Sequence, residues 1–412
     1  MEIRPILSTL LRNKTGPLLV AIQIALSLAI LANALHIVNI RQAVAARPSG
    51  IADEHSVFQI AVRSMGKSEH NEQIAAQKRQ ADQLRAVPGV LSVARVSMIP
   101  LSRNGSSTSV SASGSKDIPT TDAGMYLTPD SLAHTWGLKL AEGREALPSE
   151  IPEFNSQIQD DRPPTVLVTG ALAKKLWPGA STYVGKTMYF GSGDDAQRAR
   201  VIGVVERLQT QRADLTPTAE YAIIMPVRSS GAMPASLFTV RTEPGQRERV
   251  MKEAEAAIRT GATTPTLVNT KTMDEVRTER YRADVALSWM LITVSVLLLM
   301  ITASGIVGMA SLWVQQRRKQ IGVRRALGAR RADILRYFLT ENVMITSCGV
   351  AVGLMLAVGL NQLLVAKLEM ARLPLEYMAG GAAVFFALGI MAVYGPAWRA
   401  ATISPAMATR SA

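Results

Sequence analysis

The sequence predicts a four-helix transmembrane α region plus an α+β domain that lies outside the membrane. Three observations support this fold class. The 412-residue chain contains four long apolar runs without Asp, Glu, Lys or Arg. Its excess of Lys and Arg is concentrated beside those runs. The long segment between the first two runs has the mixed periodicity of strands and helices, so the chain divides into a membrane part and an external part.

The four charge-free runs are each long enough to cross a bilayer. Roughly 20 apolar residues span the hydrocarbon core, and a soluble helix normally keeps a polar face. The expected spans are residues 17–40, 285–314, 344–366 and 378–398. Ala43 and Ala45 also give the first run a signal-peptide-like cleavage site, but the run exceeds a typical signal core of about 7–15 residues. We therefore interpret it as an uncleaved first span.

The net charge of +13 invites a nucleic-acid interpretation, but its distribution argues against one. Residues 1–16, 315–341 and 399–412 together carry a net charge of +10, whereas the long segment 41–284 is nearly neutral. Lys and Arg collect in short cytoplasmic segments beside membrane spans. We expect both termini and residues 315–343 in the cytoplasm, 41–284 outside, and only a short external loop at 367–377. Residues 1–16 read as an amphipathic lead-in along membrane lipid.

The external segment shows a strand–helix–strand pattern on each side of a central block. This order predicts a ferredoxin-like lobe with a second lobe inserted at about 124–210. Residues 103–116 are so rich in Ser and Gly that they are expected to form a loop or a loose hairpin. No Gly or Pro lies between Thr272 and Thr302. This predicts one long helix from the external domain into the second span.

The residues do not indicate a catalytic, cofactor or metal site. The only cysteine, Cys348, lies in an apolar run, and the four histidines lack metal-ligand spacing. Gly185-Lys186-Thr187 resembles the end of a phosphate-binding loop, but that motif needs Gly where Ala180 stands. We interpret this segment as a turn, and expect ATP hydrolysis elsewhere.

Residues 315–341 combine charge with an apolar stripe. Eight Lys or Arg face two acidic residues, and apolar residues recur at three- and four-residue steps. The charge sets the topology, and the stripe is available to another protein; both interpretations hold together. Gly328 is expected to stop one helix before a short second helix enters the third span.

Two spans contain small residues at close-packing spacing. These are Gly349 with Gly353 in the third span and Ser304 with Gly308 in the second. Such pairs let helices approach closely. Packing within the chain and a dimer seam are both open.

Several stretches resemble a known family. RRKQIGVRRALGARRADILRYFLTENVM resembles the signature of FtsX-like permeases of ABC transporters. MYLTPDSLAHTWGLKLAEGRE, VLVTGALAKKLWPGASTYVGKTMYF and ARVIGVVE resemble, in order, the MacB-type periplasmic core. The ending YGPAWRAATISPAMATR is similar to the family's, except that Ser404 and Thr409 replace an Asp and a Leu.

The resemblance implies a membrane protein of the bacterial inner membrane that works with a dimer of separate ABC ATPase subunits, since only sixteen residues precede the first span. A second permease copy or a related permease would complete the complex, and a periplasmic adaptor and outer-membrane duct are often associated. ATP-driven motion would reach the periplasmic domain, which is mechanotransmission. The implied ATPase contacts are Ala329, Arg330, Arg331, Asp333, Leu335, Arg336, Phe338, Leu339 and Glu341.

Three tasks fit this architecture. The first is efflux of an antibiotic, peptide or other amphiphile from the periplasm. The second is extraction of lipoproteins from the inner membrane, and the third is control of a periplasmic hydrolase or sensor. The sequence does not distinguish among them.

Overall fold

The computed structural model describes residues 14–66, 68–155, 162–193, 195–214, 216–231, 235–368 and 371–402. Most of the expected lead-in at 1–16, together with Ser404 and Thr409, lies outside the described residues. The chain forms two compact units. One contains the residues up to Gln42 and from Asp284 onward, and the other is Ala43–Ala283.

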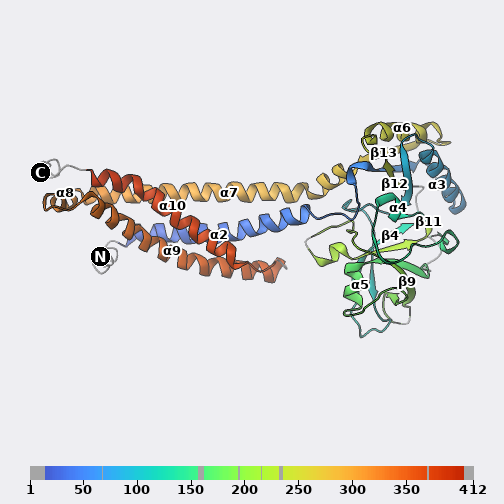
Figure 1. The fold of residues 1–412 in the computed structure, drawn as a ribbon, viewed down its shortest axis with the longest axis horizontal. Coiled ribbons are helices and arrows are strands. Elements are labelled where there is room, and N and C mark those ends of the chain that lie inside the picture. The colour runs from blue at the N-terminus through green and yellow to red at the C-terminus, as the bar shows by residue number, and fades with distance from the viewer. Residues whose placement is uncertain are drawn as a thin grey trace. The chain divides into compact units, whose positions relative to one another are not determined.

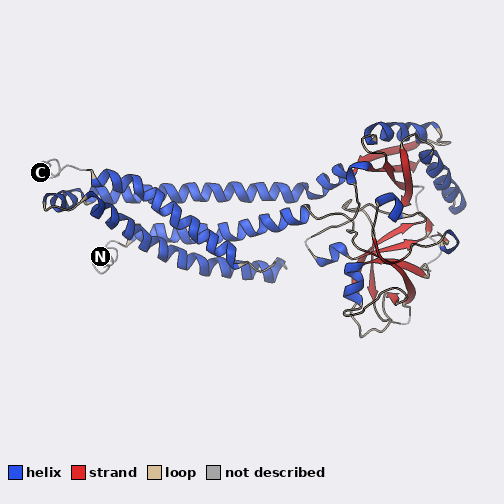
Figure 2. Ribbon diagram, in the orientation of Figure 1, coloured by secondary structure: helices blue, strands red, loops and turns tan. Residues whose placement is uncertain are grey.

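The first unit is helical (Figures 1 and 2). Its helices are α2 (Thr15–Ala45), α7 (Met273–Gln316), α8 (Arg318–Ala326), α9 (Arg331–Leu368) and α10 (Leu375–Ala401), of which α2 and α7 also extend into the second unit. In the part of the chain that the structure describes, four helices, all but α8, are long and apolar enough to cross a membrane. The four apolar helices expected from the sequence are therefore present as candidate spans.

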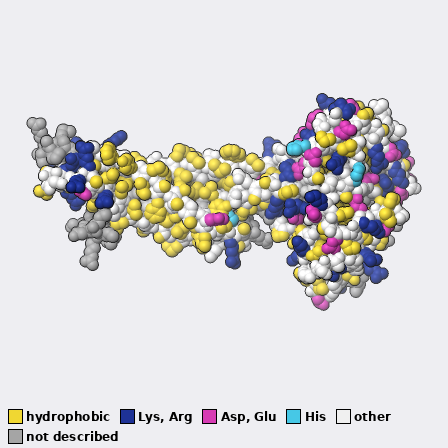
Figure 3. Space-filling model, viewed as in Figure 1, with side chains coloured by type: hydrophobic (Ala, Val, Ile, Leu, Met, Phe, Trp, Pro, Cys, Tyr) yellow, Lys and Arg dark blue, Asp and Glu magenta, His cyan; other side chains and the backbone are white. Residues whose placement is uncertain are grey.

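Helix α2 supplies much of the core of the helical unit. Ile24 and Leu28 are fully buried there, and they share one cluster with Phe385 of α10. Polar side chains join the helices as well: the hydroxyls of Ser27 and Thr302 lie 3.0 Å apart across α2 and α7. Hydrophobic side chains cover the visible outer face of these helices (Figure 3), as a lipid environment requires.

The second unit contains a four-stranded antiparallel sheet. Its strands are β1 (Val57–Ser64), β2 (Val90–Val96), β12 (Ala235–Thr242) and β13 (Thr266–Thr272), in the order β13-β1-β12-β2. Alternation places Phe58, Ile60 and Val62 on one face. Helices α3 (His70–Arg85) and α6 (Arg247–Thr260) pack their apolar residues on that face (Figure 1).

A larger mixed sheet lies between β2 and β12 in the sequence. It has the order β5-β9-β7-β10-β4-β3-β8, and an additional β8–β9 pairing closes a ring of strands around a core that includes Val110, Val166 and Ile223. Its strands are β3 (Ser107–Ser111), β4 (Thr121–Thr128), β5 (Leu140–Gly143), β7 (Thr165–Thr169), β8 (Thr187–Phe190), β9 (Gln197–Val205) and β10 (Ala222–Pro226).

Short elements complete the second unit. A two-stranded sheet pairs β6 and β11, and short helices connect the longer elements. The elements are η1 (Glu54–Ser56), α4 (Leu132–Trp136), η2 (Pro148–Glu150), β6 (Glu153–Asn155), α5 (Gly170–Leu176), η3 (Pro217–Glu220) and β11 (Arg228–Ser230).

The larger sheet extends beyond the range that the sequence indicated. Its strands run from Ser107 to Pro226, whereas the inserted lobe was expected at about 124–210. Strand β3 lies in the Ser-rich stretch that was expected to form a loop or a loose hairpin, and it forms one arm of an antiparallel pair with β4. It forms because its backbone pairs with both β4 and β8, while Val110 reaches the core.

Trp136 of α4 joins the two sheets. Its indole Nε1 donates to Thr239 Oγ1 of β12 at 2.7 Å. Its ring packs edge-to-face on Tyr126 of β4, with 5.7 Å between ring centroids. A buried aromatic pair with its polar atoms satisfied fixes geometry well, so the two sheets share one junction.

Candidate functional site

The basic segment predicted as the coupling site forms an elbow, which we define as residues 318–336: α8, the turn after it and the first turns of α9. Gly328 has φ +99°. Its N–H donates to Arg325 O at 3.2 Å, and Ala329 N–H donates to Arg324 O at 3.0 Å. These two bonds form a Schellman motif, which ends α8 with a left-handed glycine.

The helix that follows Gly328 begins with its own cap. Asp333 Oδ2 accepts from the Arg330 backbone N–H at 2.9 Å, next to the first residue of α9. Helix α9 then continues without a break to Leu368. The expected short second helix is therefore the first part of a 38-residue helix, so the first turns of α9 and the third candidate span belong to one continuous helix.

One side of the elbow, together with the turn of α9 that follows it, packs against the other helices of the helical unit. Phe338 is 4% exposed and lies in the same cluster as Ile321, Ile334 and Ala401, with Leu335 and Leu339 packed against it. Of the apolar residues expected to contact an ATPase, Phe338 thus contacts its own chain. The apolar residues of this segment divide between the interior of the helical unit and its surface. Their spacing in the sequence did not show which residues would be buried.

The other side of the elbow is exposed. Leu327 is 83% exposed and Val323 is 52% exposed. Around them the exposed predicted residues are Arg330, Arg331, Asp333 and Arg336, with Ala329 half-buried. Lys and Arg side chains gather at this end of the helical unit (Figure 3). The arrangement is an apolar tip within a basic surface, and it suits a partner with an acidic rim around an apolar pocket.

Glu341, the last predicted coupling residue, is buried in an ion pair. Its side chain is 0% exposed, and Arg317 Nη1 lies 2.9 Å and 3.1 Å from its two oxygens. The guanidinium also stacks over the rings of Trp313 and Tyr337. Because Arg317 stands between α7 and α8, this pair joins the end of α7 to α9. The pair was not predicted as such, since the partners lie 24 residues apart.

A second contact attaches α8 to the helical unit. Arg325 Nη1 donates to Ala401 O, the last carbonyl of α10, at 2.5 Å. The carbonyls at a helix C-terminus lack partners within the helix and attract cations. Helix α8 is thus held to the end of α10.

The small residues predicted for helix packing divide into two groups. A Cβ on Gly349 would lie 2.9 Å from Ala21 O, and one on Gly353 would lie 3.0 Å from the Cα of Ala25. These glycines therefore pack α9 against α2 within the chain. A Cβ on Gly308 would meet no atom within 4 Å, and Ser304 is exposed, so this pair faces outward.

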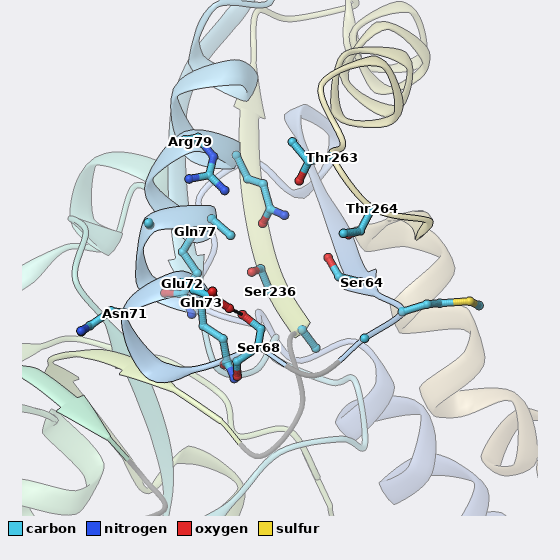
Figure 4. A pocket seen from close by; sticks show the side chains of 16 residues that line it. Ser64, Ser68, Asn71, Glu72, Gln73, Gln77, Arg79, Ser236, Thr263 and Thr264 are labelled. Carbon is cyan, nitrogen blue, oxygen red and sulfur yellow. Dashed lines mark hydrogen bonds between the residues drawn. The ribbon is translucent and has the colours of Figure 1, made fainter.

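A cleft of about 550 Å³ lies between α3 and the residues that follow α6 (Figure 4). Hydroxyl and amide side chains line it, together with Glu72, Arg79, Met65 and three alanines. Glu72 accepts from the Ser68 hydroxyl and the Glu69 N–H, so it caps α3. The cleft offers hydrogen bonds to a polar molecule.

Gly185-Lys186-Thr187 is a turn in the structure. Gly185 has φ +86°, and its N–H donates to Val201 O before β8 begins. A phosphate loop opens a helix instead. Within the described ranges, no three His, Cys, Asp or Glu side chains are grouped to hold a metal ion.

Comparisons with known proteins identify the family to which the chain belongs. The FtsX-like permease C-terminal model matches residues 292–405, and the MacB-like periplasmic core domain model matches residues 22–258. The pyoverdine export ATP-binding/permease protein PvdT of Pseudomonas syringae pv. tomato is 30% identical over 224 residues, which is 52% of this chain and 33% of that protein. The macrolide export ATP-binding/permease protein MacB of Agrobacterium fabrum is 30% identical over 280 residues, 65% of this chain and 40% of that protein.

The chain thus spans about a third to two fifths of the length of these relatives. Among solved structures, it is similar to the extracellular domain of the ABC-type transporter YknZ from Gram-positive bacteria, with a TM-score of 0.34 and 16% identity over 52% of this chain and 99% of that one. The two family models together match most of the second unit and all or part of each candidate span. The chain belongs to the MacB/FtsX-type permeases of ABC transporters.

Proposed function

We propose that this permease converts the ATP-driven motion of a separate pair of ATPase subunits into movement of its external domain. The permease would lie in the bacterial inner membrane, with both termini cytoplasmic and residues 41–284 periplasmic. The observation that carries the proposal is the continuity of α7, which runs from the external unit to the elbow without a break.

The length of α7 suits this role. Its 44 residues correspond to about 66 Å at ~1.5 Å per residue, whereas the hydrocarbon core is about 30 Å thick. Helix α2 accompanies it, and an ion pair between Arg41 and Asp284 joins the two helices. A pair of linked helices that extends beyond the bilayer can carry a displacement from one side to the other.

The elbow is the proposed contact with the ATPase. Leu327 and Val323 would enter an apolar pocket, and Arg330, Arg331 and Arg336 would face acidic residues around it. Phe338 and Glu341 would not touch the ATPase. Through their contacts inside the helical unit they would instead couple a displacement of the elbow to α9 and α7.

The proposed task is efflux of an antibiotic, peptide or other amphiphile from the periplasm. Relatives named for macrolide export and for pyoverdine export support it. The outward-facing Ser304 and Gly308 would lie against a second copy or a related permease, and a periplasmic adaptor and outer-membrane duct would complete the complex. We also propose a split ferredoxin-like lobe, which the order β13-β1-β12-β2 with two covering helices supports.

Co-purification tests the proposed contact. The tagged chain would be isolated in mild detergent as wild type, as Leu327→Asp and as Leu147→Asp, an exposed leucine of the external unit that serves as the matched control. We expect a protein with ATPase activity to accompany the wild type and the control, and its recovery to fall at least about tenfold with Leu327→Asp, since one central contact carries much of a small interface. Equal recovery with both variants, or no ATPase with the wild type, would refute the proposal.

A further inference from the structure

The first turns of α7 contact the segment that connects α2 to the external domain, which we call the connector (residues 45–54). Arg277 of α7 holds it at three places. Its Nε and Nη2 donate to the two carboxylate oxygens of Glu54, at 3.0 Å and 2.6 Å. Its Nη1 donates to Ala45 O at 2.8 Å and to Arg47 O at 3.1 Å.

These contacts engage all three nitrogens of the Arg277 guanidinium. A bidentate carboxylate pair fixes the plane of the guanidinium, which a lysine cannot do. Ala45 is the last residue of α2, and its carbonyl lacks a partner within the helix. The side chains of Arg277 and Glu54 are 24% and 16% exposed. Arg277 therefore fixes the end of α2 to the start of α7.

The connector in turn holds the loop that follows β9. Gln209 N–H donates to Ser49 O at 2.8 Å, and Gln209 Nε2 donates to Pro48 O at 3.0 Å. Gln209 is fully buried, and its own carbonyl accepts from the Tyr126 hydroxyl of β4 at 2.5 Å. A continuous set of hydrogen bonds thus leads from α7 through the connector to the larger sheet.

The same loop also contacts α7 directly. Arg280 Nη2 donates to Ala213 O at 3.1 Å, and its Nε donates to Arg212 O. Towards the other sheet, Asp274 of α7 accepts from Arg247 of α6 at 2.7 Å. The first turns of α7 are therefore bonded to elements of both lobes.

We propose that Arg277 is a positioning residue for mechanotransmission: it makes the ends of α2 and α7 one joint, so that a displacement of α7 moves the connector and, through Gln209, the larger sheet. Without the guanidinium, α7 would move past the connector, and the loop that follows β9 would be displaced less. This inference rests on the proposed function, because it requires ATP-driven motion of α7.

Hydrogen exchange measured by mass spectrometry tests the joint in the full chain with its co-purified ATPase, with and without ATP and vanadate. We compare wild type, Arg277→Gln, Glu54→Gln and the control Arg282→Gln, which removes an exposed arginine of the same helix. In the wild type and the control, nucleotide is expected to change exchange at residues 207–214. In Arg277→Gln and Glu54→Gln that change should fall at least about threefold, while the ATPase rate stays within about twofold of the wild-type rate.

The outcomes separate the two claims. If nucleotide changes no exchange in the external unit of the wild type, the proposed function fails. If the wild type responds and Arg277→Gln and Glu54→Gln respond equally, the assignment of Arg277 fails and the proposed function stands. Two variants on opposite sides of one ion pair guard against a folding defect peculiar to either, and a thermal melt identifies a variant that has not folded.

Discussion

Replacing Arg317 by Met should destabilise the helical unit far more than the loss of one surface charge. Glu341 is fully buried, and Arg317 is its partner at 2.9 Å. In Arg317→Met the carboxylate stays in the interior without its cation. Breaking a buried pair from one side costs about 3–5 kcal/mol, and the lost stacking over two aromatic rings adds about 0.5–2 kcal/mol. We therefore expect a loss of roughly 3.5–7 kcal/mol.

The double variant Arg317→Met/Glu341→Met provides the decisive comparison. Replacing both members of a buried pair by apolar residues is often neutral or stabilising, so the double variant should recover most of the loss. Glu341→Gln should cost less than Arg317→Met, about 1–3 kcal/mol, because the remaining guanidinium is 16% exposed and keeps its aromatic neighbours. The measurement is denaturant-induced unfolding in mixed micelles, followed by circular dichroism.

Two results would refute this reasoning. A loss below about 1 kcal/mol in Arg317→Met would mean that the pair behaves as a surface contact. A double variant whose loss equals the sum of the losses in Arg317→Met and Glu341→Met, each measured alone, would mean that the two side chains act independently.

Two further predictions concern helix packing and acid stability. Gly353→Leu should destabilise the helical unit by about 1–3 kcal/mol or more, because its Cβ would lie 3.0 Å from Ala25; Gly308→Leu should leave the unfolding of the single chain unchanged, and equal melting losses would contradict this difference. Hydrogen bonds from Arg144 lower the pKa of Glu150 from about 4.5 to about 2. The stabilisation from this pair should thus be present above about pH 4.5 and lost as the pH falls through about 2, and parallel melting curves of wild type and Arg144→Gln between pH 6 and pH 2 would argue against it.

The elbow shows how far the sequence could predict a site. Charge density and the glycine at position 328 indicated the segment and its break, because positive charge beside a span and a left-handed helix end are local properties. Which side of the stripe is exposed is not local. Ile334 and Phe338 face inward because α2, α7 and α10 are already there, and Leu327 faces outward because nothing in the chain covers it.

The same distinction applies to the second unit. The strand–helix–strand pattern predicted before the central block corresponds to β1, α3 and β2. For the stretch that contains β3 a loop and a loose hairpin were both expected, since a Ser-rich stretch has no pattern of its own and acquires strand structure only from the neighbouring β4 and β8.

The sequence by itself determined four apolar runs, a long unbroken α7 and a basic segment beside a span, because hydrophobicity, charge and helix propensity act over short distances along the chain. Only the tertiary structure brought Arg317 to Glu341 and Arg277 to Glu54, which is 223 residues away. Such pairs have no characteristic spacing in the sequence. Their energy depends on burial and on partners that the fold brings together.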